Sequence, residues 1–177
     1  IPKNKHTVIL GSNGSGKSTL LGLLSGVFVP NSGTANIASN KLSYIGAAPL
    51  IISGTLRDNL LYGNDLKIED EKLLRMLKLY KVFGDESVKL DAKINNKSLS
   101  SGQMQKISFI RAMLSNTEIL FLDESTSNLD DESKKLISAI LDDLDITIVN
   151  CTHNPEDFKF DQVFKVTNIN QTSIVST

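Results

Sequence analysis

A glycine-rich stretch near the start of the chain constrains the fold more than any other feature. It reads Gly11-Ser12-Asn13-Gly14-Ser15-Gly16-Lys17-Ser18-Thr19, which satisfies the P-loop pattern. A short apolar run, His6 to Leu10, precedes it, and a helical pattern from Ser18 to Leu24 follows it. Strand, phosphate-binding loop and helix in this order are the entry to an α/β fold.

The chemistry of this loop indicates a nucleoside triphosphate. Its glycines let successive backbone amides turn inward around phosphate oxygens, and the helix N-terminus adds a positive dipole. Lys17 then meets the outer phosphates, and the Ser18 hydroxyl ligates Mg²⁺. The alternative is a chance glycine-rich turn before a helix, which the flanking strand and helix disfavour.

Composition limits the classes of protein to consider. The 177 residues fit one domain, and 19 basic against 20 acidic side chains leave no basic field for nucleic acid. The single Cys151 favours a reducing compartment. No apolar run approaches the roughly 20 residues that span a bilayer, so we expect any membrane link to come through a partner. Because Ile1 is not Met and a strand follows almost at once, we expect that N-terminal strands are missing.

Hydrophobic periodicity predicts the remaining elements. After the turn at Pro30 to Gly33 we expect a small hairpin, with strands at Ala35–Ala38 and Leu42–Ile45. Thr55 and Asp58 match a capping box that opens a short helix through Leu61. The stretch from Thr55 to Asn96 is predicted to be mostly helical, including Leu66 to Val82. The later predictions are a helix after Gly102, a strand at Ile119–Leu122, a helix at Lys134–Leu144, a strand at Ile146–Cys151, and a closing pair at Val163–Val166 and Thr172–Val175.

Two carboxylates follow the apolar strand Ile119–Leu122. Open α/β sheets bind ligands at the carboxyl ends of their strands, so Asp123 and Glu124 are predicted to lie beside the P-loop. Asp123 would hold Mg²⁺, mostly through water, and Glu124 would polarise the water that attacks the γ-phosphate. The alternative is a polar strand end that caps the next helix.

Between these motifs stands Leu99-Ser100-Ser101-Gly102-Gln103, which resembles the LSGGQ signature of ABC transporter ATPases. The resemblance implies that ATP is the nucleotide. It also implies that the signature residues, Ser100, Ser101, Gly102 and Gln103, close over the γ-phosphate that a second copy of the domain holds. Without the resemblance, Ser100 and Ser101 would read simply as helix N-caps.

Three further segments fit the same family. Ser127-Asn128-Leu129-Asp130 resembles the D-loop, which crosses the dimer interface, although Asp130 could equally cap the following helix. His153 matches the switch histidine that reaches the γ-phosphate in this family. Ser53 to Asn59, with Tyr62-Gly63, is similar to a segment of ABC exporters and favours an exporter over an importer.

The resemblance implies an α/β fold: a P-loop NTPase core with a mostly parallel sheet flanked by helices, plus a helical subdomain that carries the signature. We expect residues 1–46 and 115–177 to form the nucleotide-binding core and residues 47–114 the helical subdomain. The implied partners are a second ATP-binding domain, identical or different, and a transmembrane transport domain in the same longer polypeptide. This would place the domain on the cytoplasmic face of a membrane.

The chain departs from the family pattern in three places. Ala47 stands where the family has the Q-loop glutamine, which touches Mg²⁺ and the attacking water and relays the nucleotide state to the transport domain. The adenine-stacking aromatic of the family lies upstream of the P-loop strand, before Ile1. Ser101 replaces the first glycine of the signature, which is milder because a backbone amide makes the expected contact.

Three functions compete at this stage. The first is an ATPase that drives an exporter, with Glu124, His153 and Lys17 in catalysis. The second, motivated by Ala47, is a regulatory module that closes on ATP but hardly hydrolyses it. The third is a soluble ABC ATPase of the DNA-repair or chromosome-organising type, which would need a long coiled coil in place of the short stretch from Ala47 to Leu99.

Overall fold

The central sheet determines where every site residue lies. In the computed structural model, which describes residues 1–37, 39–84, 86–169 and 172–176, the sheet has six strands in the order β2-β5-β6-β1-β7-β8. All neighbours are parallel except β7 and β8. The strands are β1 (His6–Leu10), β2 (Leu42–Gly46), β5 (Ile119–Asp123), β6 (Thr147–Cys151), β7 (Gln162–Ile169) and β8 (Thr172–Ser176). This confirms the predicted α/β class with a mostly parallel sheet.

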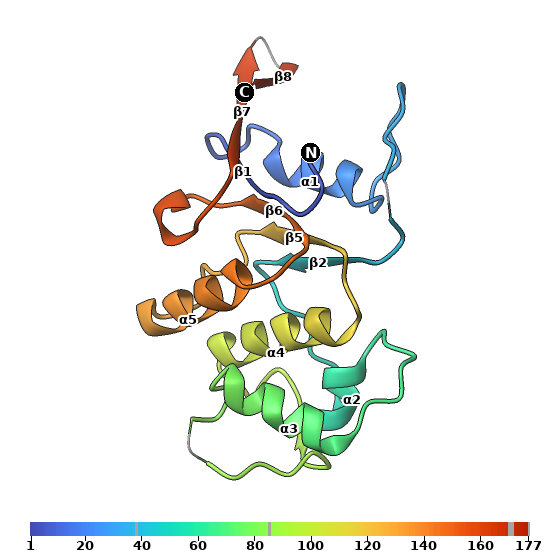
Figure 1. The fold of residues 1–177 in the computed structure, drawn as a ribbon, viewed down its shortest axis with the longest axis vertical. Helices are drawn as coiled ribbons and strands as arrows, with labels where there is room; N and C mark the ends of the chain where they lie inside the picture. The colour runs from blue at the N-terminus through green and yellow to red at the C-terminus, as the bar shows by residue number, and fades with distance from the viewer. Residues whose placement is uncertain (38, 85, 170–171, 177) are drawn as a thin grey trace.

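Helices cover both faces of this sheet (Figure 1). Helix α1 (Lys17–Leu24) lies on one face, and α4 (Ser101–Leu114) and α5 (Asp131–Asp142) lie on the other. Successive side chains of a strand point to opposite faces. Accordingly, Phe121 packs in the apolar cluster on the α1 side, whereas Leu120 and Leu122 belong to the larger cluster with α4 and α5. Burial on both faces explains why β5 is a continuous apolar run.

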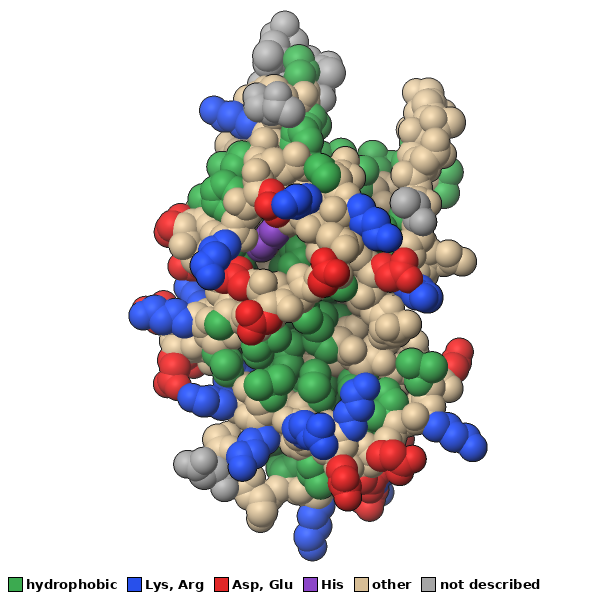
Figure 2. All heavy atoms as spheres, viewed as in Figure 1, with side chains coloured by type: hydrophobic (Ala, Val, Ile, Leu, Met, Phe, Trp, Pro, Cys, Tyr) green, Lys and Arg blue, Asp and Glu red, His purple; other side chains and the backbone are tan. Residues whose placement is uncertain are grey.

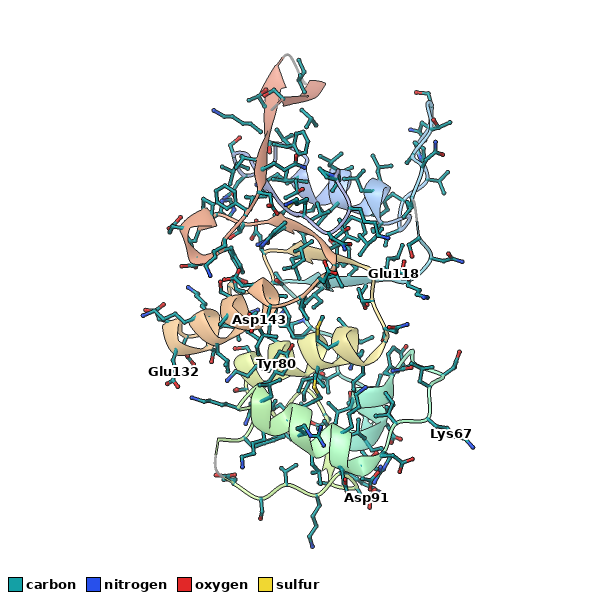
Figure 3. All side chains as sticks on the ribbon, in the orientation of Figure 1. Lys67, Tyr80, Asp91, Glu118, Glu132 and Asp143 are labelled. Carbon is teal, nitrogen blue, oxygen red and sulfur yellow. The ribbon has the colours of Figure 1, made fainter. Side chains whose placement is uncertain are left out.

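A smaller helical unit lies beyond α4 (Figure 1). It contains α2 (Leu56–Leu61), α3 (Asp70–Leu79) and a two-stranded antiparallel sheet of β3 (Gly54–Thr55) and β4 (Lys93–Ile94). Tyr80 lies fully buried where α3 meets α4 (Figure 3). On the face that Figure 2 shows, Lys and Arg side chains gather over α3, whose apolar residues Leu73 and Leu77 are buried. The helix is therefore amphipathic, with its charged stripe in solvent.

The capping box is confirmed at the start of α2. The Thr55 hydroxyl accepts a hydrogen bond from the Asp58 backbone N–H at 3.0 Å, and the Asp58 carboxylate accepts one from the Thr55 N–H at 2.8 Å. Asn59, fully buried one residue later, donates to the carbonyls of Ile52 and Thr55 and accepts from the Ile52 N–H. These bonds tie the segment before α2 to the helix.

Two structural predictions were wrong. No hairpin precedes β2: residues 35–37 form no strand, Ala38 lies outside the described residues, and β2 instead pairs in parallel with β5. The apolar residues of β2 are better buried inside the sheet than in an exposed hairpin. The stretch from Thr55 to Asn96 is also less helical than predicted, because α3 covers only Asp70–Leu79 and the chain then takes left-handed backbone at Lys81, with φ of 48°.

Candidate functional site

The P-loop joins the end of β1 to the start of α1. Gly14 and Gly16 have φ values of 76° and 97°, in the left-handed region that favours glycine. Gly11 is needed for space, because a Cβ atom there would lie 2.6 Å from the backbone oxygen of Val166. The loop therefore has the tight curvature and the bare backbone that bring successive amides round a phosphate group.

Lys17 lies inside this loop and is only 5% exposed. Its Nζ donates hydrogen bonds to the carbonyl oxygens of Gly11, at 2.9 Å, and Ser12, at 3.1 Å. An open hollow adjoins the ammonium group. Its lining comprises Asn13, Gly14, Gly16, Lys17, Ser18, Thr19, Glu124 and His153. The structure thus brings the P-loop together with two of the predicted catalytic side chains.

Asp123, the last residue of β5, accepts two hydrogen bonds from side chains. The Ser18 hydroxyl donates to its Oδ1 at 3.0 Å, and the Tyr44 hydroxyl donates to its Oδ2 at 2.7 Å. Ser18 lies in the first turn of α1, and Tyr44 comes from β2, the strand beside β5. The contact between Asp123 and the P-loop agrees with the sequence prediction, whereas Tyr44 was missed because the predicted hairpin placed its strand elsewhere.

Two groups beside Asp123, the Tyr44 phenol and the Cys151 thiol, stay protonated at neutral pH. Burial, together with the hydrogen bond to Asp123, raises the pKa of the Tyr44 phenol above its ordinary value, so the hydroxyl acts as a donor. Burial also raises the pKa of the Cys151 thiol to about 12. Cys151 is therefore a neutral packing residue at the end of β6 rather than a reactive thiolate.

Glu124 and His153 form a pair at the edge of the hollow. Oε1 of Glu124 lies 2.9 Å from Nε2 of His153. Glu124 has left-handed backbone, with φ of 50°, and its N–H donates to the carbonyl of Cys151 at 2.9 Å. Strained backbone at a non-glycine residue persists where the surrounding structure holds it, and it concentrates at functional sites. The two residues follow the adjacent parallel strands β5 and β6, at the end where such sheets bind ligands.

The signature residues lie at the start of α4. Ser100 is the N-cap, its hydroxyl accepts from the Gln103 N–H at 3.1 Å, and the Gln103 side chain accepts from the Ser100 N–H at 2.9 Å. Ser101 and Gly102 form the first turn of the helix. Within the described chain, none of these four residues lines the P-loop hollow. One copy of the chain therefore does not bring its own signature to its own P-loop.

Asp130, in the segment that resembles the D-loop, caps α5. Its Oδ1 accepts a hydrogen bond from the Ser133 N–H at 2.7 Å, and this bond holds the pKa of the carboxyl below its ordinary value. Asn128 reaches the other way and donates to the carbonyl of Ala47 at 2.6 Å. Gln105 on α4 donates to the carbonyl of Gly46 at 3.1 Å. Two amide side chains, both missed by the sequence reasoning as site residues, thus hold the loop that follows β2.

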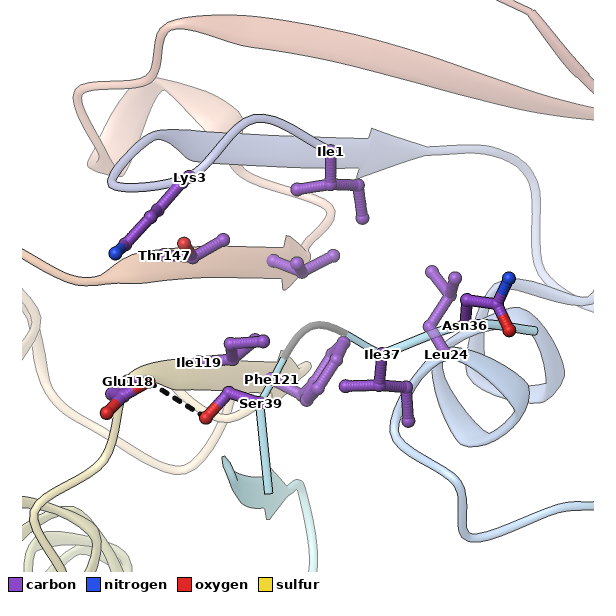
Figure 4. Close-up of a pocket in the computed structure, with 11 residues that line it drawn as sticks. Ile1, Lys3, Leu24, Asn36, Ile37, Ser39, Glu118, Ile119, Phe121 and Thr147 are labelled. Atoms are coloured by element: carbon purple, nitrogen blue, oxygen red, sulfur yellow. Dashed lines mark hydrogen bonds between the residues drawn. The ribbon is translucent and has the colours of Figure 1, made fainter. Parts of the chain in front are cut away.

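A second hollow lies on the α1 side of the sheet (Figure 4). Its lining is mainly apolar and includes Leu24, Ile37 and Phe121. The hydrogen bond drawn there joins the Ser39 hydroxyl to the Glu118 carboxylate at 2.9 Å. Because it contains no P-loop residue and neither of the paired catalytic candidates, we assign the site to the P-loop hollow.

The residues beside the P-loop fit a magnesium ion that arrives with a nucleotide. The Ser18 hydroxyl and the Asp123 carboxylate are the hard oxygen donors that Mg²⁺ prefers. Among the described residues, no group of three or more His, Cys, Asp or Glu side chains could hold a metal. Mg²⁺ commonly needs only one or two protein ligands when phosphate oxygens and water complete its shell.

In the described part of the chain no helix has the length and apolar character of a membrane span.

Comparisons with known proteins agree with this geometry. The family model described as ABC transporter matches residues 1–127. The chain is 37% identical to the lactococcin-A transport/processing ATP-binding protein LcnC of Lactococcus lactis, over 86% of the chain and 24% of LcnC. It is 31% identical to the glutathione/L-cysteine transport system ATP-binding/permease protein CydD of Haemophilus influenzae, over 93% of the chain and 31% of CydD.

A solved structure shows the same fold. It is described as a bacterial Atm1-family ABC exporter with ATP bound, and it superposes with a TM-score of 0.80 at 21% identity. The match covers 92% of this chain and 32% of the exporter chain. The present chain thus spans about a quarter to a third of the length of these relatives.

Proposed function

This chain belongs to the ABC transporter family, because the family model matches 127 of its 177 residues. On that premise we propose that it is an ATP-binding domain that hydrolyses ATP to drive an exporter. The observation that carries the proposal is the pair of Glu124 and His153, 2.9 Å apart, on the hollow that Lys17 also lines. A carboxylate that can activate a water molecule beside a phosphate-binding loop supports hydrolysis of a triphosphate.

In this proposal the P-loop holds the phosphates of ATP. The amides of residues 11–19 surround the phosphate oxygens, with the N-terminus of α1 behind them. The buried Lys17 would share its ammonium group between the loop carbonyls and the outer phosphates and so offset their charge. Ser18 and Asp123 would hold Mg²⁺, which neutralises charge on the phosphate oxygens when it is bound.

Glu124 is the proposed general base. Its left-handed backbone and its N–H bond to the carbonyl of Cys151 fix the direction in which the carboxylate leaves the sheet. His153 holds one carboxylate oxygen, and the other is left to orient and polarise a water molecule. Because His153 also lines the hollow, its ring would contact the terminal phosphate.

The complete site would need two copies of the domain, arranged head to tail. The signature residues Ser100 to Gln103 begin a helix whose N-terminal amides can bind anions, yet they lie away from the hollow of their own chain. In the proposed dimer they close over the γ-phosphate of the partner copy, and Asp130 joins the interface. The partner copy would be either the same chain or a related ATP-binding domain.

The relatives indicate the wider partner. CydD is named as an ATP-binding/permease protein, and the structural neighbour as an exporter. We infer that this domain works with a transmembrane transport domain, as part of the same longer polypeptide, at the cytoplasmic face of a membrane. ATP binding would close the dimer and hydrolysis would reopen it.

Ala47 favours a second candidate function, a module that closes on ATP but hydrolyses it slowly. Ala47 is exposed and follows Gly46, the last residue of β2, which lies opposite Asp123. The methyl group of Ala47 supplies neither a metal ligand nor a hydrogen bond to water. The two functions differ in turnover and not in binding, so a measured rate of hydrolysis distinguishes them.

Phosphate release at increasing protein concentration tests the proposal. Because each site draws on two copies, the rate per chain with Mg²⁺ and ATP should rise with protein concentration and then level off. The Lys17→Ala variant serves as the background. A rate per chain that does not depend on concentration overturns the composite site. ATP-dependent dimerisation without release above the Lys17→Ala background supports the regulatory module instead.

A further inference from the structure

Tyr44 contacts the carboxylate that the proposed metal site depends on. Its hydroxyl donates to Oδ2 of Asp123 at 2.7 Å, while the Ser18 hydroxyl donates to Oδ1 at 3.0 Å. The carboxylate is therefore held from both sides. The Ser18 hydroxyl donates its proton to Asp123 and still has lone pairs that can bind a cation. If the Asp123 carboxylate were anchored at one oxygen alone, it could rotate about its Cβ–Cγ bond.

The strand arrangement explains how the phenol reaches Asp123. Gly46 is the register partner of Asp123, and Tyr44 precedes Gly46 by two residues, so its side chain leaves β2 on the same face. A Cβ atom on Gly46 would lie 3.5 Å from Cε1 of Tyr44, so the ring lies along the strand over the glycine. A larger side chain at 46 would compete with the ring for this space.

We propose that Tyr44 is a positioning residue of the metal site. From strand β2 it supplies a polar anchor for the Asp123 carboxylate, which the methyl group of Ala47 cannot supply. This inference rests on the proposed function. Ala47 and Tyr44 are both on the segment that ends beside Asp123, and only the tyrosine carries a hydrogen-bonding side chain. The anchor acts through Asp123: the phenol fixes Oδ2, so that Oδ1 keeps facing Ser18.

A donor that orients a metal ligand acts on metal affinity more than on nucleotide affinity. Loss of such an outer partner typically lowers metal affinity 10- to 100-fold. Because Tyr44 is 39% exposed, water can replace part of the lost bond, and we expect the low end of this range. The P-loop and Lys17 contacts to phosphate do not involve Tyr44, so binding of free nucleotide should not change.

The test is Tyr44→Phe, which keeps the ring and removes only the hydroxyl. Mn²⁺, a paramagnetic substitute for Mg²⁺, is titrated into the whole chain saturated with a non-hydrolysable ATP analogue, and bound metal is measured by electron paramagnetic resonance. We expect about 10-fold weaker Mn²⁺ binding, with affinity for the analogue in EDTA and the midpoint of urea unfolding both unchanged. The control is Tyr62→Phe, since Tyr62 presents its ring to Arg111 at 5.4 Å. It should match the wild type in every assay.

The possible results separate this inference from the proposed function. If the wild type binds the analogue and Mn²⁺ and Tyr44→Phe binds Mn²⁺ equally well, the positioning role is overturned while the proposed function stands. If Tyr44→Phe weakens binding of the analogue in EDTA, or lowers the unfolding midpoint, the tyrosine is merely structural and the inference is again overturned. A wild type that binds no analogue overturns the proposed function itself.

Discussion

The Nε2 atom of His153 lies 2.9 Å from Oε1 of Glu124, and the two residues lie just beyond the carboxyl ends of neighbouring parallel strands. The pairing depends on the register of β5 and β6, in which Asp123 lies opposite Cys151. It depends equally on the left-handed backbone of Glu124, which turns the chain immediately after Asp123. Both side chains therefore reach the P-loop hollow together.

Replacing Glu124 with Gln should separate ATP binding from hydrolysis. The amide keeps the shape of the side chain and removes the proposed base, so we expect phosphate release to fall at least about 100-fold. ATP binding should persist, and the ATP-bound dimer should accumulate because it cannot reopen. Phosphate release and size-exclusion chromatography with ATP measure the two effects. Elution as a monomer only, with ATP at high protein concentration, would count against the head-to-tail dimer.

Lys17→Ala should weaken productive nucleotide binding sharply. In the proposed site the buried ammonium group of Lys17 would offset charge on the outer phosphates, and alanine would leave that charge uncompensated. Titration with a fluorescent ATP analogue and steady-state phosphate release measure affinity and turnover. Lys41→Ala is the matched control, because Lys41 is exposed and forms a salt bridge of 2.8 Å with Glu118. Neither of these two residues belongs to the P-loop. Unchanged affinity and turnover in Lys17→Ala would refute the assigned site.

Contiguous motifs explain which parts of the site could be predicted. The P-loop is a local pattern of glycines before a helix, and its flanking elements lie within one residue of the predicted bounds. Asp123 and Glu124 were predicted at a strand end because Ile119 to Leu122 is a continuous apolar run. The side chains that the sequence reasoning missed, Tyr44, Gln105 and Asn128, bond to residues far away in the sequence.

Strand pairing is where local reasoning failed. Leu42–Ile45 follows a turn cluster, so a hairpin with the nearest upstream segment was predicted, whereas β2 pairs with β5 far along the chain. The spacing of apolar residues along a strand does not determine which distant strand will pair with it. The same limit affects Leu66 to Val82, whose helical period continues past the point where Lys81 takes left-handed backbone. Local conformation ended that helix earlier than its apolar spacing indicated.

Asn59→Ala should destabilise the chain. Asn59 is fully buried, and its side chain makes three hydrogen bonds to the backbone of Ile52 and Thr55. Alanine removes all three of these part-buried bonds, so we expect the free energy of unfolding to fall by about 2–4 kcal/mol. Urea unfolding followed by circular dichroism measures the change. The exposed Asn31→Ala should stay within about 0.5 kcal/mol of the wild type; equal effects would contradict the role of Asn59.

Asp161 should contribute stability that disappears in acid. Its carboxylate accepts from Nζ of Lys5 at 2.9 Å and from the His6 N–H at 2.8 Å, and these bonds, the Lys5 bond first, hold its pKa below the ordinary value. A lowered folded-state pKa means that the contribution is complete above the unfolded pKa of about 4. It is then lost as the pH falls through the folded value.

The measurement compares wild type and Asp161→Asn by urea unfolding at neutral pH and at several values below 4. The wild type should be the more stable at neutral pH, and the two free energies of unfolding should converge as Asp161 takes up its proton. The exposed Asp143→Asn serves as a control for the loss of one negative charge. A difference between wild type and Asp161→Asn that is the same at all pH values would contradict the assignment.

Ala47→Gln should raise the rate of ATP hydrolysis in the dimer-competent protein. The loop that carries residue 47 is already held in place, because Asn128 donates to the Ala47 carbonyl at 2.6 Å and Gln105 to the Gly46 carbonyl at 3.1 Å. These are backbone contacts, so the substitution leaves them intact. The new amide would add a second polar group to hold Mg²⁺ and orient the attacking water. Steady-state phosphate release at saturating ATP measures the gain.

The Glu124→Gln background decides whether the gain has the proposed cause. Orienting a water molecule is of little use without a base to polarise it, so the gain from Ala47→Gln should vanish in the double variant. A gain that survives without Glu124 would refute the proposed mechanism. If Ala47→Gln leaves the rate unchanged while ATP-driven dimerisation persists, either another group already supplies the missing contact or the loop serves only coupling to the membrane partner. The proposed anchor Tyr44 is the first candidate for such a group. In that case Ala47→Gln should raise the rate only when Tyr44→Phe has removed the phenol that holds Asp123.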